Sequence, residues 1–285
     1  MDLIRNERAA VLNRSEERRG VMIPRTVEKI MCSRDGKREY RIMVAKPAAE
    51  PPPSGYPVIY LLDANSVFGT MEETVRVQGG RPEKTGVVPA VIVGIGYLTE
   101  APFASARYYD FTMPSAVTEA PARPNGAAWP EQGGAESFLA FIEETVKPEI
   151  EREYTIDRGR QTIFGHSLGG LFVLQVLFTQ PGLFQSYIAG SPSIHWNKRN
   201  LLEAERNFTA RSDVDFGKIG LMVAIGELEK SHKSGIYDNA KELAERLSGL
   251  ADRGLRLQFK SFEGEGHVSV LPALVSRAAR FALSM

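Results

Sequence analysis

Cysteine is almost absent from the chain, and so are the common patterns of metal ligands. Among 285 residues Cys32 is the only cysteine, so no disulfide can form within the chain, which fits a reducing compartment. No H-E-x-x-H pattern or cysteine pair is present, and Gly94-x-Gly96 alone does not make a phosphate-binding loop. We therefore expect no metal and no other cofactor. Cys32 lies in an apolar, strand-like run, which predicts a buried side chain and not a nucleophile.

Long hydrophobic runs and an excess of charge of one sign are also lacking. The longest apolar runs, residues 87–98 and 169–178, fall short of the ~18 residues needed to cross a bilayer. The first residues mix acidic and basic side chains without an apolar core, unlike a signal peptide. Lysine and arginine number 35, as do aspartate and glutamate, which argues against nucleic acid or an anionic membrane as a partner. We expect a soluble, cytoplasmic protein.

The composition that remains is ordinary for a globular domain. A hydrophobic content of 43% and a charged content of 25% suffice for a sizeable core. We expect residues 1–20 to form a charged N-terminal arm and residues 21–285 to form a single domain. Residues 99–134 contain several prolines and no clear periodicity, which predicts a long loop or lid over a cleft.

Short apolar segments alternate with helical patterns along the rest of the chain. The alternation predicts an α/β fold with a mostly parallel central sheet and helices on both faces, and the Asp35-Gly36 hairpin adds antiparallel strands at the N-terminal edge. In such sheets the reactive groups gather at the carboxyl ends of the strands. We expect strands at residues 27–33, 39–46, 58–62, 89–96, 186–190, 219–225 and 255–262, and helices at 135–154 (kinked at Pro148), 198–211, 237–250 and 268–285.

The most informative segment is Gly165-His166-Ser167-Leu168-Gly169, a G-x-S-x-G pattern between an apolar strand and an apolar helix. This arrangement is typical of a nucleophile elbow, in which a serine stands at the apex of a strained strand-to-helix turn. Small residues at positions −2 and +2 let the backbone pass close to the serine. The following helix directs its first N–H groups toward the place where an oxyanion would form. The alternative is a glycine-rich turn capped by a serine.

A serine hydroxyl needs a base, and histidine is the usual one. His267 directly follows the last predicted strand between flexible glycines, so we expect it to be the base of Ser167. His195 follows another strand and is the second candidate. The ring of His166 should point away from the apex, and His232 lies in a polar loop.

Two further parts of a hydrolytic site can be placed at strand ends. Glu227 and Glu229 follow the strand at residues 219–225, and alternation would put both carboxylates on the same side. We favour Glu229 as the acid that orients His267, with Glu227 second and a Ser-His pair without an acid third. The oxyanion donors are expected to be the N–H groups of Leu168 and Asn65, with Ala64 as the alternative to Asn65.

Four stretches of the sequence carry a resemblance to a known family: residues 60–65, 107–112, 165–170 and 191–197. Residues 226–229 and 266–267 stand where that family has its acid and its base. Together these stretches resemble the "putative esterase" branch of the α/β-hydrolases, nearest to the siderophore trilactone esterases. The resemblance implies an α/β-hydrolase fold and cofactor-free ester hydrolysis, with a catecholate trilactone of the enterobactin or bacillibactin type as substrate. Some members of this branch work with a Ser-His pair alone.

For an anionic aromatic substrate we expect Arg107 to attract charge and Tyr109 and Trp196 to stack on catechol rings. The alternatives are that Arg107 pairs with Asp110 to hold its loop and that Trp196 belongs to the core. Two other functions remain open at this point. One is a general short-acyl or feruloyl-type carboxylesterase, and the other is a siderophore-binding protein on an inert hydrolase fold.

Overall fold

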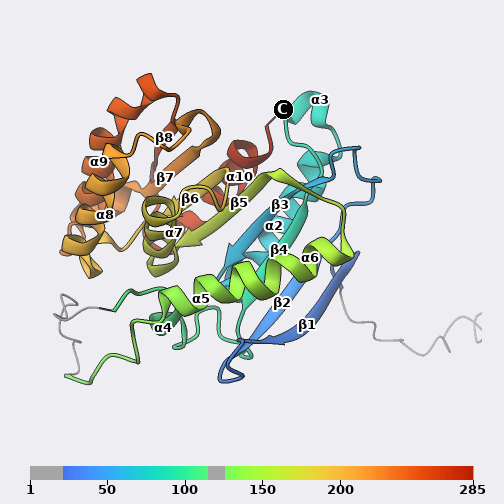
Figure 1. The fold of residues 1–285 in the computed structure, drawn as a ribbon, viewed down its shortest axis with the longest axis horizontal. Helices are drawn as coiled ribbons and strands as arrows, with labels where there is room; N and C mark the ends of the chain where they lie inside the picture. Colours follow the sequence, from blue (N-terminus) through green and yellow to red (C-terminus); the bar gives the residue numbers. More distant parts are fainter. Residues whose placement is uncertain (1–21, 115–125, 285) are drawn as a thin grey trace, which may run out of the picture.

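A single mixed sheet of eight strands organises the molecule (Figure 1). The computed structural model describes residues 22–114 and 126–284. Within these residues the strand order is β1-β2-β4-β3-β5-β6-β7-β8. The strands are β1 (Thr26–Cys32), β2 (Glu39–Ala45), β3 (Tyr56–Leu62), β4 (Val91–Gly96), β5 (Ile156–His166), β6 (Ser186–Gly190), β7 (Gly220–Gly226) and β8 (Arg256–Phe262).

The strands from β4 to β8 are parallel, whereas β1 and β2 form the antiparallel edge that the Asp35-Gly36 hairpin predicts. Strands β3, β4 and β7 are buried along their whole length, as continuous apolar runs in a parallel sheet should be. The register pairs His166 with Gly190, Gly190 with Ala224, and Gly226 with Phe262. The segments that follow β5, β6, β7 and β8 therefore emerge side by side at one edge of the sheet.

Helices cover both faces of the sheet (Figure 1), which confirms the predicted α/β architecture. Helices α2 and α10 bury one core with one face of the sheet, and α5 to α9 bury the other. The helices are α2 (Ala64–Gly79), α3 (Pro82–Thr85), α4 (Arg107–Asp110), α5 (Ala135–Phe141), α6 (Lys147–Glu153), α7 (Leu168–Thr179), α8 (Lys198–Ala210), α9 (Ile236–Leu247) and α10 (Val270–Leu283), with shorter 3-10 turns η2 (Ile194–Trp196), η3 (Phe216–Lys218), η4 (Glu227–Ser231) and η5 (Ser248–Arg253).

The helix predicted for residues 135–154 is present but is not uniform. Its middle turn, Ile142–Val146, is π-helical and separates α5 from α6. Pro148 stands in the first turn of α6, where its missing N–H and its ring disturb the preceding turn. A π-helical turn absorbs this disturbance without ending the helix.

Cys32 is exposed, so the prediction of a buried side chain was wrong. It is the last residue of β1, an edge strand that has β2 as its neighbour on one side, and its sulfur lies 4.0 Å from the Glu39 carboxylate. The predicted arm at residues 1–20 lies outside the described residues. The predicted loop or lid at residues 99–134 is described except for residues 115–125, and it contains the short helix α4.

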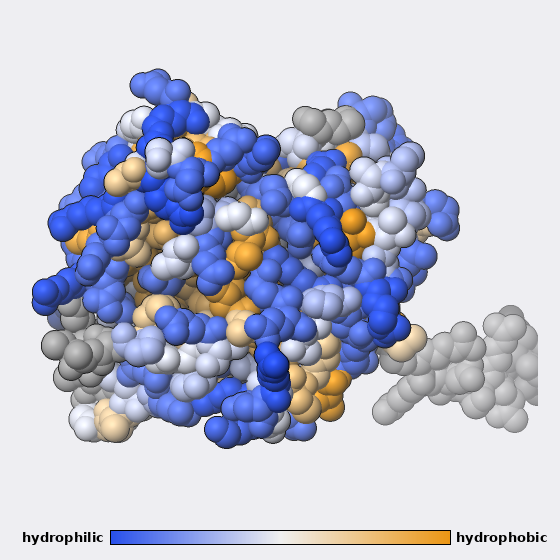
Figure 2. All heavy atoms as spheres, in the orientation of Figure 1, coloured by the Kyte–Doolittle hydropathy of each residue, from blue (hydrophilic) through white to orange (hydrophobic). Residues whose placement is uncertain are grey.

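The face of the molecule shown in Figure 2 is largely hydrophilic, with apolar residues visible in a hollow near its middle. In the part of the chain that the structure describes, no helix is long and apolar enough to cross a membrane.

Candidate active site

Ser167 occupies the apex of the turn between β5 and α7. Its backbone lies at φ 62° and ψ −118°, a combination of angles that residues other than glycine rarely adopt. A Cβ on Gly165 would collide with the carbonyl of Gly169, and one on Gly170 would lie 2.8 Å from the carbonyl of Gly190. A Cβ on Gly169 would make only ordinary contacts, the nearest at 3.5 Å to Asp63. The turn therefore needs glycine at positions 165 and 170 more than at position 169.

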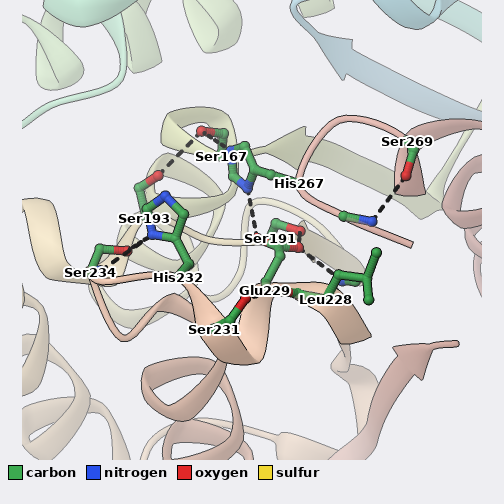
Figure 3. A network of polar contacts seen from close by, with 12 residues as sticks. Ser167, Ser191, Ser193, Leu228, Glu229, Ser231, His232, Ser234, His267 and Ser269 are labelled. Carbon is green, nitrogen blue, oxygen red and sulfur yellow. Dashed lines mark hydrogen bonds and ion pairs between the residues drawn. The ribbon is translucent and has the colours of Figure 1, made fainter. Parts of the chain in front are cut away.

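The structure brings together the three side chains predicted for proton transfer (Figure 3). His267 Nε2 lies 3.0 Å from Ser167 Oγ, and His267 Nδ1 lies 2.7 Å from Glu229 Oε2. Ser167 follows β5, Glu229 lies in η4 after β7, and His267 follows β8. The three groups thus form a continuous hydrogen-bonded line along the edge of the sheet where β5, β7 and β8 end.

Glu229 is held as a charged group in a buried place. Its second oxygen, Oε1, accepts hydrogen bonds from Ser191 Oγ at 2.6 Å and from the Gly226 N–H at 2.9 Å. Burial acts to raise the pKa of Glu229, but the hydrogen bonds from His267, Ser191 and Gly226 outweigh it, and the pKa lies below its usual value. The ionised carboxylate accepts a hydrogen bond from the His267 Nδ1–H, so the ring carries its proton on Nδ1 and its Nε2 is free to accept a hydrogen bond from Ser167.

The structure separates the two glutamates that alternation could not distinguish. Glu229 is buried beside His267, whereas Glu227 pairs on the surface with Lys230 at 3.0 Å. The prediction that both carboxylates lie on the same side of the chain was wrong. The chain leaves the extended conformation at Gly226 and enters the 3-10 turn η4. With about three residues per turn, positions 227 and 229 point in different directions.

The predicted oxyanion donors lie at two helix starts. Leu168 is the first residue of α7, and Ala64 and Asn65 are the first two residues of α2, where N–H groups have no acceptor within the helix. The Asn65 side chain is used elsewhere: its Nδ2 donates to the carbonyls of Tyr97 and Thr99, and its Oδ1 accepts from the Tyr97 N–H.

Arg107 does not pair with Asp110, which was the structural alternative raised for it. Its guanidinium instead makes two hydrogen bonds to Asp63, at 2.9 and 2.8 Å, and one to the His166 carbonyl at 3.2 Å. Asp63 is the residue before α2 and has φ 51°. The buried Arg107 thus links the start of α2 to the turn that carries Ser167. Its side chain is only 7% exposed to solvent, so little of it can contact a ligand.

Asp110 is fully buried and accepts hydrogen bonds from the hydroxyls of Tyr40 and Tyr97, at 3.0 and 2.9 Å. Burial raises the pKa of Asp110 to about 6, against the effect of these two donors. Asp110 therefore anchors α4 to the sheet through two tyrosines and not through an arginine.

The two aromatic residues predicted to contact substrate have different surroundings. Trp196 is half-buried, its Nε1 donates to Gln132 at 3.0 Å, and its ring lies 4.6 Å from that of Trp129 and 5.6 Å from that of Tyr108. Tyr109 lies under the guanidinium of Arg38 at 3.5 Å. A Cβ on Gly134 would run into the ring of Tyr109, so that ring is packed on both sides.

The remaining histidines surround the base but do not contact the serine hydroxyl. His166 is buried, its ring lies 4.8 Å from that of His267, and burial lowers its pKa to about 3, helped by His267 and Arg107, so it stays neutral. Neither ring nitrogen of His166 has a hydrogen-bond partner among the described residues. His195 is half-buried with a lowered pKa caused first by burial, and His232 is paired with Ser234.

Three residues of the site escaped the sequence analysis: Asp63, Ser191 and Ser193. Both serines follow β6 at its carboxyl end, where the rule for reactive groups in parallel sheets would have found them. Among the described residues, no group of three or more His, Cys, Asp or Glu side chains could hold a metal ion.

The sheet carries Ser167 at the turn after β5 and His267 after its last strand, β8. This arrangement defines an α/β-hydrolase. The chain belongs to the "Putative esterase" family, whose model matches residues 33–269. The predicted family resemblance is therefore confirmed, and the chain is a member of a family of ester hydrolases.

Several relatives are named for siderophore esters. The chain is 63% identical, over 92% of its length and 90% of the relative's, to the ferri-bacillibactin esterase BesA of Bacillus subtilis (strain 168). It is 33% identical, over 82% of its length and 71% of the relative's, to the apo-salmochelin esterase of Escherichia coli O6:H1. Among solved structures, the BES protein from Bacillus cereus aligns with a TM-score of 0.87 at 42% identity, covering 94% of this chain and 100% of the other.

Proposed function

We propose that the protein is a serine esterase that hydrolyses a siderophore trilactone through an acyl-enzyme. The observation that carries the proposal is the line of contacts from Glu229 through His267 to Ser167, at 2.7 and 3.0 Å. Nucleophile, base and orienting acid in hydrogen-bond reach are the arrangement that activates a serine for attack on an ester carbonyl.

In the proposed reaction Ser167 Oγ attacks the ester carbonyl while its proton passes to His267 Nε2. Glu229 stabilises the imidazolium, and the N–H of Leu168 with that of Asn65 or Ala64 holds the oxyanion. His267 then returns the proton to the departing alkoxide. Water repeats the same sequence on the acyl-enzyme, releasing the acid and restoring Ser167.

The proposed substrate class follows from the relatives and fits the neighbourhood of the site. The names of several relatives specify siderophore esters. Tyr108, Trp129 and Trp196 form an aromatic group, and Trp196 belongs to η2, which begins directly after Ser193, itself in contact with Ser167. Aromatic rings can stack on the catechol groups of such an ester. An esterase for short acyl groups alone would not need them. A cytoplasmic location stays a prediction.

A comparison of two esters tests the substrate. We expect kcat/KM to be larger for a catecholate trilactone of the bacillibactin type than for p-nitrophenyl acetate, because the larger ester has aromatic groups to bind. Chromatography of the trilactone products and absorbance of p-nitrophenol give the two rates, with Ser167→Ala as the blank. Faster turnover of p-nitrophenyl acetate would instead favour the general carboxylesterase.

Replacement of the orienting acid tests the proposed role of Glu229. Glu229→Gln should lower kcat about 10³–10⁴-fold with little change in KM. Since Oε1 accepts from Ser191 and Gly226, the amide oxygen will face them and the NH₂ group will face His267 Nδ1. The imidazole then carries its proton on Nε2, which cannot accept the proton of Ser167.

Glu227→Gln is the matched control, because Glu227 is the same residue type two positions away and its partner is the surface Lys230. Its kcat should stay within about twofold of the parent, as expected when an exposed ion pair is lost. An unchanged kcat in Glu229→Gln would show that the protein works with Ser167 and His267 alone.

A further inference from the structure

The turn that follows β6 is built against the nucleophile. The Ser167 N–H donates to the Gly190 carbonyl at 2.8 Å, and the Ser193 N–H donates to the Ser167 carbonyl at 3.1 Å. Ser191 has φ 38°, and a Cβ on Gly170 would lie 3.1 Å from Pro192 Cα. Two backbone hydrogen bonds and close packing therefore fix residues 190–193 relative to the serine.

This turn places a second hydroxyl beside the first. Ser193 Oγ lies 3.2 Å from Ser167 Oγ, and Ser193 is only 5% exposed. Figure 3 shows the hydrogen bond between the two serines, and Ser193 and His267 lie on different sides of the Ser167 hydroxyl. The reacting oxygen thus has two polar neighbours, the imidazole and the Ser193 hydroxyl.

The hydrogen-bond network assigns the direction of this contact. His267 donates a hydrogen bond from its Nδ1–H to the ionised Glu229, so Nε2 carries no proton and must accept a hydrogen bond from the Ser167 hydroxyl. The single proton of Ser167 is then used, and Ser167 Oγ can only accept from Ser193. The order of donation is Ser193 to Ser167 to His267.

We propose that Ser193 is a further catalytic residue, whose hydroxyl stabilises the negative charge that develops on Ser167 Oγ. The inference rests on the proposed function. As the Ser167 proton moves to His267 Nε2, Oγ gains charge and the bond from Ser193 becomes charge-assisted, while Ser193 keeps its own proton. When the acyl-enzyme breaks down, Ser167 Oγ leaves with the electron pair of the ester bond, and the same donor stabilises it until His267 returns the proton.

The length of the hydrogen bond between Ser193 and Ser167 indicates that it can raise the rate of the reaction as well as hold the two side chains in place. Hydroxyl-to-hydroxyl bonds are typically about 2.7–2.8 Å, and bonds to a charged oxygen about 2.5–2.7 Å, so a contact of 3.2 Å is weak in the resting state. It gains strength as charge appears on Oγ. An interaction that is stronger in the transition state than in the ground state raises kcat.

Ser193→Ala removes the hydroxyl and keeps the backbone bond to Ser167. We expect the rate constants for acylation and deacylation, measured from the burst and steady state with p-nitrophenyl acetate, to fall about 10–100-fold each, the range for a hydrogen bond to a charged group. The rate of phosphonylation by a fluorophosphonate should fall by a similar factor. Ser193→Cys, with a weaker donor, should lie between Ser193→Ala and the parent.

Ser231→Ala is the control, since the exposed Ser231 hydroxyl donates to the Leu228 carbonyl and should not affect any of these rates. Equal phosphonylation rates in the parent and in folded Ser193→Ala would overturn the inference. A parent protein that is not phosphonylated at all would overturn the proposed function instead, so the two failures are distinguishable.

Discussion

Ser167→Ala is expected to lower kcat for ester hydrolysis by about 10⁴-fold or more, the largest effect of any single change in this protein. The reason is that, in residues 22–114 and 126–284, no other hydroxyl is both hydrogen-bonded to His267 and placed at the apex of the turn. Without Oγ there is no acyl-enzyme, and the remaining groups act only on water that happens to bind. Steady-state kinetics with p-nitrophenyl acetate and with a trilactone measure the loss.

Mass spectrometry after fluorophosphonate treatment gives an independent result. The parent should gain one phosphonyl group on Ser167, and Ser167→Ala should gain none. The substitution leaves the backbone in place, and thermal unfolding should change little because one small side chain replaces another. Ser231→Ala serves as the surface control and should keep full activity and labelling. Substantial turnover by folded Ser167→Ala, or an unlabelled parent, would favour the binding-protein alternative.

Arg107→Met is expected to lower the free energy of unfolding by about 3–5 kcal/mol, because it leaves a buried carboxylate without its partner. Asp63 is 2% exposed, and both of its oxygens accept from Arg107. Burial raises the pKa of Asp63, and Arg107 acts against that rise. Chemical denaturation at pH 7.5 measures the change, and the melting temperature should fall by roughly 10 °C.

Arg211→Met is the matched control, because Arg211 makes the same kind of paired hydrogen bonds to Asp213, whose side chain is 67% exposed, so the free energy of unfolding should change far less than in Arg107→Met. The double variant Asp63→Asn/Arg107→Met tests the cause directly. It removes the buried charge as well as its partner, and asparagine tolerates the φ of 51° at position 63. We expect it to be more stable than Arg107→Met alone. Equal stability of the two would mean that lost packing, and not the stranded charge, is the cause.

The parts of the site set by one local pattern could be predicted from the sequence. The elbow is one of them, because a strand, a glycine-flanked serine and a helix are consecutive in the chain. His267 is another, since parallel strands bring their carboxyl ends to one edge, and the structure places its ring 3.0 Å from Ser167 Oγ. The α/β fold followed from the alternation of apolar segments.

The parts that depend on three-dimensional pairing could not be predicted. Alternation failed for Glu227 and Glu229 because the chain turns at Gly226, and the buried partner of Arg107 proved to be Asp63, 44 positions earlier. The prediction that Cys32 is buried was wrong because no residue of the edge strand β1 is fully buried, so the apolar side chains of this strand do not enter the core completely. The catalytic roles of Ser167, His267 and Glu229 belong to the proposed function. The predicted roles of Leu168 and Asn65 as oxyanion donors, and of Arg107, Tyr109 and Trp196 as substrate contacts, stay predictions.

The order of the strands has a consequence for biosynthesis. Ser167 follows a central strand, whereas Glu229 and His267 come from the segments after the two strands at the far edge, β7 and β8. A nascent chain that has left the ribosome only as far as β7 carries the hydroxyl without the imidazole that activates it. Under the proposed mechanism, Ser167 therefore gains its base only after the segment that follows β8 has been synthesised, and a shorter nascent chain has no activated hydroxyl.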